Sequence, residues 1–109
     1  MKNWRHLTLE EGGIDIEDPY SADIKISEVV LPGSSRLIGK TLNTIGFRDR
    51  YGANVLAIGR NDIIKRTSLQ DIPLERGDKL LLAGHFERLE ECRQATEFDQ
   101  FRYVLRSEL

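Results

Sequence analysis

One short apolar run limits what this chain can fold into. Ala53–Ile58 is apolar at every position except Asn54, and it follows directly on Gly52. A run of this length predicts a strand that is covered on both faces, rather than a surface strand with alternating polarity. The fold must therefore provide cover on both sides of the sheet at this strand.

Further apolar patterns predict the remaining elements and their order. The predicted strands are Asp23–Leu31, Ala53–Gly59, Ile63–Lys65 and Lys79–Ala83, and the predicted helices are Gly39–Ile45 and His85–Ala95. Arg60-Asn61-Asp62 is expected to form a tight turn between the second and third strands. Phe86, Leu89 and Cys92 are expected on the buried side of the second helix. The order β-α-β-β-β-α predicts an α+β fold, a small sandwich in which two helices cover a mixed β-sheet.

Composition divides the chain into a tail, a domain and an extension. Residues 1–22 are charged, with scattered Gly and Pro, and are predicted to form a tail or linker in which Trp4 and Leu7 could dock on an unspecified surface. Residues 23–95 hold the predicted elements and form one domain. Residues 96–109 are a C-terminal extension, in which alternating apolar residues predict a strand or an interface segment.

Charge and cysteine content exclude several classes of function. A net charge of -2 argues against a role on nucleic acid, where a basic stripe is expected. The single cysteine, Cys92, excludes an internal disulfide and a cysteine-based zinc site. His6 and His85 have no partners at ligand spacing, so no metal site is predicted. We also expect no signal peptide and no membrane-spanning helix, because no apolar run approaches about 20 residues.

One segment superficially resembles a nucleotide-binding loop. Gly33 and Gly39-Lys40-Thr41 are separated by five residues, whereas a phosphate-binding P-loop needs four. A nucleotide-hydrolysing enzyme dependent on Lys40 is therefore a disfavoured alternative. Nucleophilic catalysis would need Ser34, Ser35 or Cys92 together with a base and an orienting acid. Cys92 lies on a helix face that is expected to pack inward, where a small core residue is the favoured interpretation. No catalytic residue is therefore predicted, and the protein is not expected to be an enzyme.

The connection Phe47–Gly52 carries more chemistry than a turn requires. Arg48 and Arg50, with Asn54 at the start of the following strand, could bind a phosphate and a base edge, or the carboxylates of a partner chain. The simpler interpretation is a set of surface ion pairs with Asp49, which would contribute little. On the residues alone, the ion-pair interpretation is favoured.

Three linked motifs in this order resemble a known family. They are Glu28–Leu42 with its Leu37-Ile38-Gly39-Lys40-Thr41-Leu42 ending, Phe47–Arg60, and Leu74–Gly84 with its Gly77-Asp78 pair. The region from Asp23 to about Ala95 that carries them resembles the C-terminal lobe of the regulator of potassium conductance (RCK_C), also called the TrkA C-terminal domain.

This resemblance implies a regulatory, ligand-sensing domain on the cytoplasmic side of a membrane, belonging to an ion or anion transport protein. Such domains usually act as homodimers and contact the membrane-embedded segments of the parent. They follow a nucleotide-binding lobe in potassium systems, or occur in the cytosolic loop of sodium-coupled divalent-anion symporters. Ala95–Phe98 favours the symporter version. The alternative is a purely structural dimerisation module without a small-molecule ligand.

Some family members bind cyclic di-AMP (c-di-AMP) at the dimer interface, so the resemblance implies c-di-AMP as a candidate nucleotide ligand, with no certain cofactor. The positions used there carry departures at Asn43, Gly46 and Asp49. An acid beside a phosphate is unfavourable unless a cation such as Arg50 neutralises it. The candidate ligand-binding residues are Leu42, Phe47, Arg48, Arg50, Asn54 and Val55.

Overall fold

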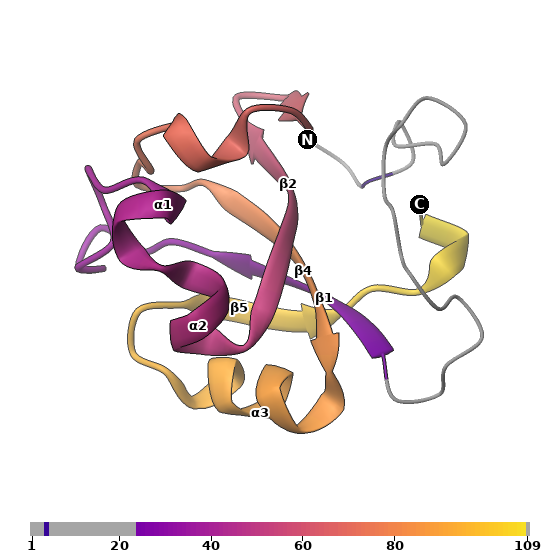
Figure 1. Cartoon of the computed structure of the whole chain (residues 1–109). Coiled ribbons are helices and arrows are strands. Elements are labelled where there is room, and N and C mark those ends of the chain that lie inside the picture. Colours follow the sequence, from indigo (N-terminus) through magenta and orange to yellow (C-terminus); the bar gives the residue numbers. More distant parts are fainter. Residues whose placement is uncertain (1–3, 5–23, 109) are drawn as a thin grey trace.

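A single antiparallel sheet forms the centre of the computed structural model, which describes Trp4 and residues 24–108 (Figure 1). The sheet has five strands in the order β3-β2-β4-β1-β5. Their bounds are β1 Ile24–Val30, β2 Ala53–Arg60, β3 Ile63–Lys65, β4 Lys79–His85 and β5 Asp99–Tyr103. The predicted α+β class, the first four strands and the β2–β3 hairpin are confirmed.

The expected mixed sheet is wrong, because every strand pairing among the described residues is antiparallel. β1 and β2 run parallel to each other, because both are antiparallel to β4, and the helical segment between them provides the crossover that such a pair needs. They are not neighbours, however, because β4 lies between them and pairs with both. β1 and β2 therefore point in the same direction in the sheet, but no hydrogen bonds join them.

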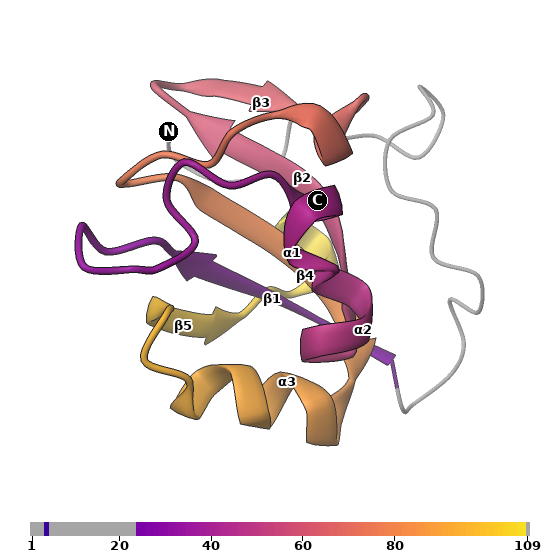
Figure 2. The same ribbon diagram turned by 60° about the vertical axis from the view of Figure 1, so that its left-hand side comes forward.

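Short helices cover one face of this sheet (Figure 2). They are α1 Leu42–Ile45, α2 Phe47–Tyr51 and α3 Phe86–Gln94, and 3₁₀ turns occur at η2 Leu69–Asp71 and η3 Arg106–Glu108. The predicted helix Gly39–Ile45 begins later than expected, because Thr41 caps it by accepting a hydrogen bond from the Thr44 N–H (3.1 Å). The Phe47–Gly52 connection, expected as a turn, is helical in α2.

Both faces of the central strands are buried, which explains their unbroken apolar runs. On β4, Leu80 and Leu82 face the core under the helices, whereas Leu81 and Ala83 face a second cluster on the other side. The second cluster includes Trp4, which is fully buried, and Val104. Trp4 was expected to dock on an unspecified surface, and the structure shows that this surface is the sheet of its own fold. Leu7 and the rest of the predicted tail lie outside the described residues.

The C-terminal extension packs as part of the fold. The alternation of Phe101 and Tyr103 predicted a strand or an interface segment, and the structure has a strand there, β5, which pairs with β1. Phe98 is buried in the main core, 5.1 Å from Tyr51 between ring centroids. Phe86 was expected to face inward, but it is 49% exposed and stacks on Tyr103. The prediction failed because Phe86 is the first residue of α3, where Leu89 and Cys92 already fill the inward face.

A buried carboxylate on β1 joins three distant parts of the chain. Glu28 accepts hydrogen bonds from the Trp4 indole N–H (2.9 Å) and the Arg102 guanidinium (2.7 Å). Arg102 also donates to Glu108 (2.8 Å), and the Lys79 ammonium lies 3.9 Å from Glu28. These partners stabilise the charge of a side chain that is almost fully buried.

A second buried ion pair joins β2 to the turn before β4. Arg60 donates through two nitrogens to both oxygens of Asp78, at 2.8 and 2.7 Å. Asp78 is 1% exposed and also accepts a hydrogen bond from the Glu75 N–H. The hydrogen bond to Asp78, aided by nearby carboxylates, raises the pKa of Arg60 despite its partial burial. The second and third sequence motifs are therefore joined in the structure by the ion pair between Arg60 and Asp78.

We expect Asp78→Asn to lower the free energy of unfolding by about 3 kcal/mol, because it leaves the Arg60 guanidinium without its buried counter-charge. Urea denaturation of the purified protein measures this loss. Glu91→Gln is the matched control, since it breaks only the exposed Arg88–Glu91 pair (3.1 Å) and should change stability little. Equal losses in the two variants would contradict a structural role for the buried pair.

The Cys92 thiol provides a test of the core under α3. It is 1% exposed, and burial raises its pKa to about 11. The unfolded thiol ionises near pH 8.5 to 9, so between about pH 9 and 11 only the unfolded state loses its proton. We therefore expect the stability of the wild type to fall over this range relative to Cys92→Ala, as followed by denaturation at several pH values. Parallel curves would contradict the buried, protonated thiol.

Candidate functional site

A sharp corner between α1 and α2 shapes the candidate site. Gly46 ends α1 and begins α2, and its backbone is left-handed with φ of 65°. Its N–H donates to the carbonyls of Leu42 and Asn43, and its carbonyl accepts from the Arg50 N–H (2.9 Å). The corner turns Leu42 and Phe47 into the core while Arg48 and Asp49 remain exposed.

Aromatic packing holds α2 in place. The Phe47 ring lies 4.8 Å from Tyr51 and 6.0 Å from Phe98, measured between centroids. Gly52 then ends α2 with φ of 70°, and a Cβ there would overlap the Arg88 guanidinium. Only glycine fits this position without displacing the Arg88 side chain. In β2, which follows directly, Ala53 is buried and Asn54 is exposed.

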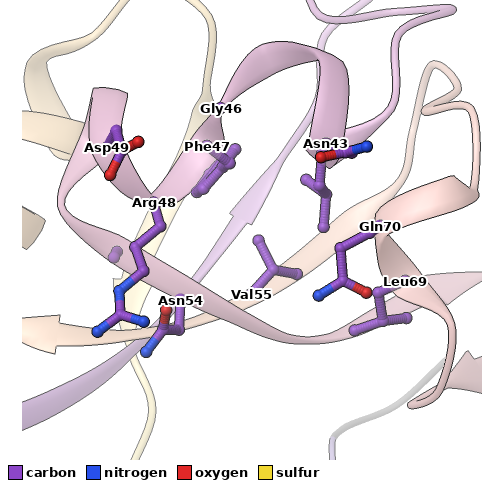
Figure 3. A pocket seen from close by; sticks show the side chains of 11 residues that line it. Asn43, Gly46, Phe47, Arg48, Asp49, Asn54, Val55, Leu69 and Gln70 are labelled. Carbon is purple, nitrogen blue, oxygen red and sulfur yellow. The ribbon is translucent and has the colours of Figure 1, made fainter.

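These segments enclose a pocket of about 420 Å³ (Figure 3), a volume within the range that small-molecule sites occupy. The pocket combines an apolar floor with polar groups at its rim. Its lining residues are Leu42, Asn43, Gly46, Phe47, Arg48, Asp49, Ala53, Asn54, Val55, Leu69 and Gln70.

The structure brings five of the six predicted site residues together: Leu42, Phe47, Arg48, Asn54 and Val55. Arg50 does not line the pocket, and its guanidinium lies 5.7 Å from the centroid of the Tyr51 ring. Sequence reasoning missed Leu69 and Gln70, which come from η2. No local motif marks them, because the turn reaches the pocket only through tertiary packing against α1.

The two charged side chains that line the pocket, Arg48 and Asp49, form no ion pairs within the described part of the chain. Among the residues that the structure describes, Arg48 and Asp49 form no ion pair with each other or with a third side chain. In Figure 3 the Arg48 guanidinium lies near Asn54 at one end, and Gln70 lies at the other. An unpaired guanidinium beside a carboxamide can bind an anionic group such as a phosphate.

Other chemistries find no support in the geometry. The backbone groups of Gly39 and Lys40 already form hydrogen bonds with Leu74. The Gly39 N–H donates to the Leu74 carbonyl (2.7 Å), and the Lys40 carbonyl accepts from the Leu74 N–H (2.8 Å). Those groups cannot wrap a phosphate as a P-loop does. Within residues 24–108 and Trp4, no three His, Cys, Asp or Glu side chains gather to hold a metal ion.

The segment that forms this pocket matches a known protein family. The TrkA-C domain model matches residues 26–95, which contain all the lining residues. The chain belongs to the TrkA-C domain family. The sequence motifs and the fold agree with this assignment.

The relatives of this TrkA-C chain include transporters. Residues of the chain are 43% identical over 65 positions to the uncharacterized transporter YfbS of Escherichia coli K12, and 37% identical over 62 positions to the probable sodium/sulfate cotransporter 3 of Chlamydomonas reinhardtii. These matches cover 60% and 57% of this chain but only 11% and 7% of the relatives. The chain thus corresponds to a small part of each. Among the described helices, none is long and apolar enough to cross a membrane.

Solved structures of RCK_C domains share the fold. The RCK C domain of the potassium transport protein KtrA, in complex with c-di-AMP, is 28% identical with a TM-score of 0.56, covering 65% of this chain and 81% of that one. The RCK_C domain dimer of S. agalactiae BusR, in complex with c-di-AMP, is 17% identical with a TM-score of 0.59, covering 66% and 89%. The second likeness establishes the fold alone.

The corner at Gly46 can be tested by two substitutions. Gly46→Ala should lower the free energy of unfolding by about 1 kcal/mol, because a Cβ disfavours positive φ. No atom lies within 4 Å of the added Cβ, so crowding is not the cause. Gly46→Asn should lose less, since Asn tolerates the left-handed region. Equal losses in urea denaturation would contradict the backbone as the source of the effect.

Proposed function

We propose that this TrkA-C domain is a ligand-sensing regulatory domain of a membrane ion or anion transport protein, acting through a dimer. The observation that carries the proposal is the unpaired Arg48 guanidinium beside Asn54, in a pocket of about 420 Å³ with an apolar floor. A group that no intramolecular contact uses is available to a ligand. The transporter context rests on relatives such as YfbS and the probable sodium/sulfate cotransporter 3, whose names describe transporters.

The ligand we propose is a phosphate-bearing nucleotide, with c-di-AMP as the first candidate. Two RCK_C neighbours are complexes with this dinucleotide, and one of them is a dimer. In this chain Arg48 would bind a phosphate, Asn54 would donate to it or to the base, and Leu42, Phe47 and Val55 would contact the apolar faces of the ligand. Asp49 opposes this arrangement with a like charge, so rising ionic strength should weaken phosphate binding less here than at a purely basic site.

The regulatory step follows from the dimer. A ligand changes an equilibrium between two arrangements only by binding one of them more tightly. We propose that ligand binding changes how two copies of the domain contact each other, and that membrane-embedded segments of the parent, with the domain on their cytoplasmic side, respond to that change. In this proposal the membrane-embedded part of the parent protein, and not this domain, selects the transported ion.

Thermal unfolding of the purified chain with c-di-AMP tests the ligand. At a hundred times its dissociation constant, c-di-AMP should raise the free energy of unfolding by about 2.7 kcal/mol. Arg48→Ala should abolish this stabilisation, because it removes the phosphate-binding cation. Arg50→Ala is the matched control, since it removes an arginine of the same helix that lies outside the pocket, and it should keep the stabilisation.

Two outcomes would contradict the proposal. Stabilisation that persists in Arg48→Ala would place the ligand elsewhere. Absence of stabilisation by c-di-AMP, ATP, NAD, sulfate or citrate, together with a stable dimer in analytical ultracentrifugation, would favour the structural dimerisation module instead.

A further inference from the structure

We infer that Gln70 is a specificity-determining residue of this pocket, and that it selects a ligand with an adenine base over one with guanine. The inference rests on the proposed function, because it assigns the base-reading group of the same site. Gln70 lines the pocket from η2, on the opposite wall from α2. In Figure 3 its carboxamide points toward Val55 and the interior of the pocket, while Arg48 and Asn54 lie at the far end.

The backbone around η2 fixes this placement. Ser68, directly before the turn, has a left-handed backbone with φ of 55°, which is unusual for a residue other than glycine. Leu69 is buried in the main core and anchors the turn. After the turn, Leu74 forms two backbone hydrogen bonds with Gly39 and Lys40, just before α1. Gln70 is therefore held beside α1 at a defined position, which a specificity contact requires.

The carboxamide of Gln70 has no role within the fold. Its side chain is exposed and forms no hydrogen bond with any other described residue. It offers one acceptor oxygen and one donor amide group side by side. A residue in this position is free to pair with a ligand, and its replacement should leave the fold intact.

The chemistry of the base edges favours adenine. A carboxamide pairs with the N6 amino donor and the N7 acceptor of adenine through two hydrogen bonds. Guanine presents two acceptors, O6 and N7, on the corresponding edge, and these suit a cation rather than a carboxamide. Arg48 lies at one end of the pocket, where it can bind the phosphate, and Gln70 lies at the other end, where it can bind the base. This arrangement matches the phosphate and the base at the two ends of one adenine nucleotide.

Isothermal titration of c-di-AMP and cyclic di-GMP into the purified chain tests the inference. We expect the wild type to bind c-di-AMP at least about tenfold more tightly, as one bidentate pair typically provides. Gln70→Leu should reduce the ratio of the two affinities toward one. Gln70→Glu should weaken c-di-AMP binding as well, because a carboxylate cannot donate to N7. Gln94→Leu, which changes an exposed glutamine at the end of α3, should keep the wild-type ratio.

The outcomes separate this inference from the proposed function. If the wild type binds c-di-AMP, Arg48→Ala abolishes binding and Gln70→Leu keeps the wild-type ratio, the inference is overturned while the proposed function stands. A wild type that binds neither dinucleotide overturns this inference and excludes c-di-AMP as the ligand, while stabilisation by ATP or NAD would leave the proposed regulatory function standing. A ratio that falls in Gln70→Leu but not in Gln94→Leu, with unchanged melting temperatures, supports the assignment.

Discussion

The buried ion pair between Arg60 and Asp78 is the constraint on which the other parts of the structure depend. It joins the last residue of β2 to the turn before β4, and Arg60 also donates to the Pro73 carbonyl (2.9 Å). The loop that precedes β4 is thereby fixed against the sheet. Leu74 in this loop then forms two hydrogen bonds with Gly39 and Lys40 before α1. One charge pair thus orients both the central strands and the two walls of the pocket.

The fold extends beyond the segment that matches the family. The match ends at residue 95, yet Phe98 is buried in the main core and Arg102 on β5 binds the buried Glu28. The Glu97 carboxylate also accepts hydrogen bonds from the Ser35 hydroxyl and the Arg36 N–H in the loop after β1. Because these contacts join β5 and its connection to β1, the C-terminal segment stabilises the sheet that carries the pocket.

The strands were predictable from sequence because their residues are buried on both faces, so apolar runs such as Leu80–Ala83 leave few alternatives. Helix α2 was missed because it has only five residues, lies between two glycines and carries three charged side chains. The spacing of Phe47 and Tyr51, four residues apart on one helical face, was the available signal. Arg48 and Asn54 could be identified from the family motif, whereas Gln70 could not, because its place in the pocket depends on the packing of η2.

Helices as short as α1 and α2 have no stability of their own, so their position depends on what they pack against. α1 is held by Leu42 in the core, and α2 by the contacts of Phe47 and Tyr51 with Phe98. A ligand bound to Arg48 would act on α2, and a displacement of α2 can reach Phe98, next to β5, through the Phe47 and Tyr51 rings. The same aromatic contacts that fix the pocket therefore provide a physical connection from the pocket to the edge of the sheet, by which binding at one site can alter the surface at another.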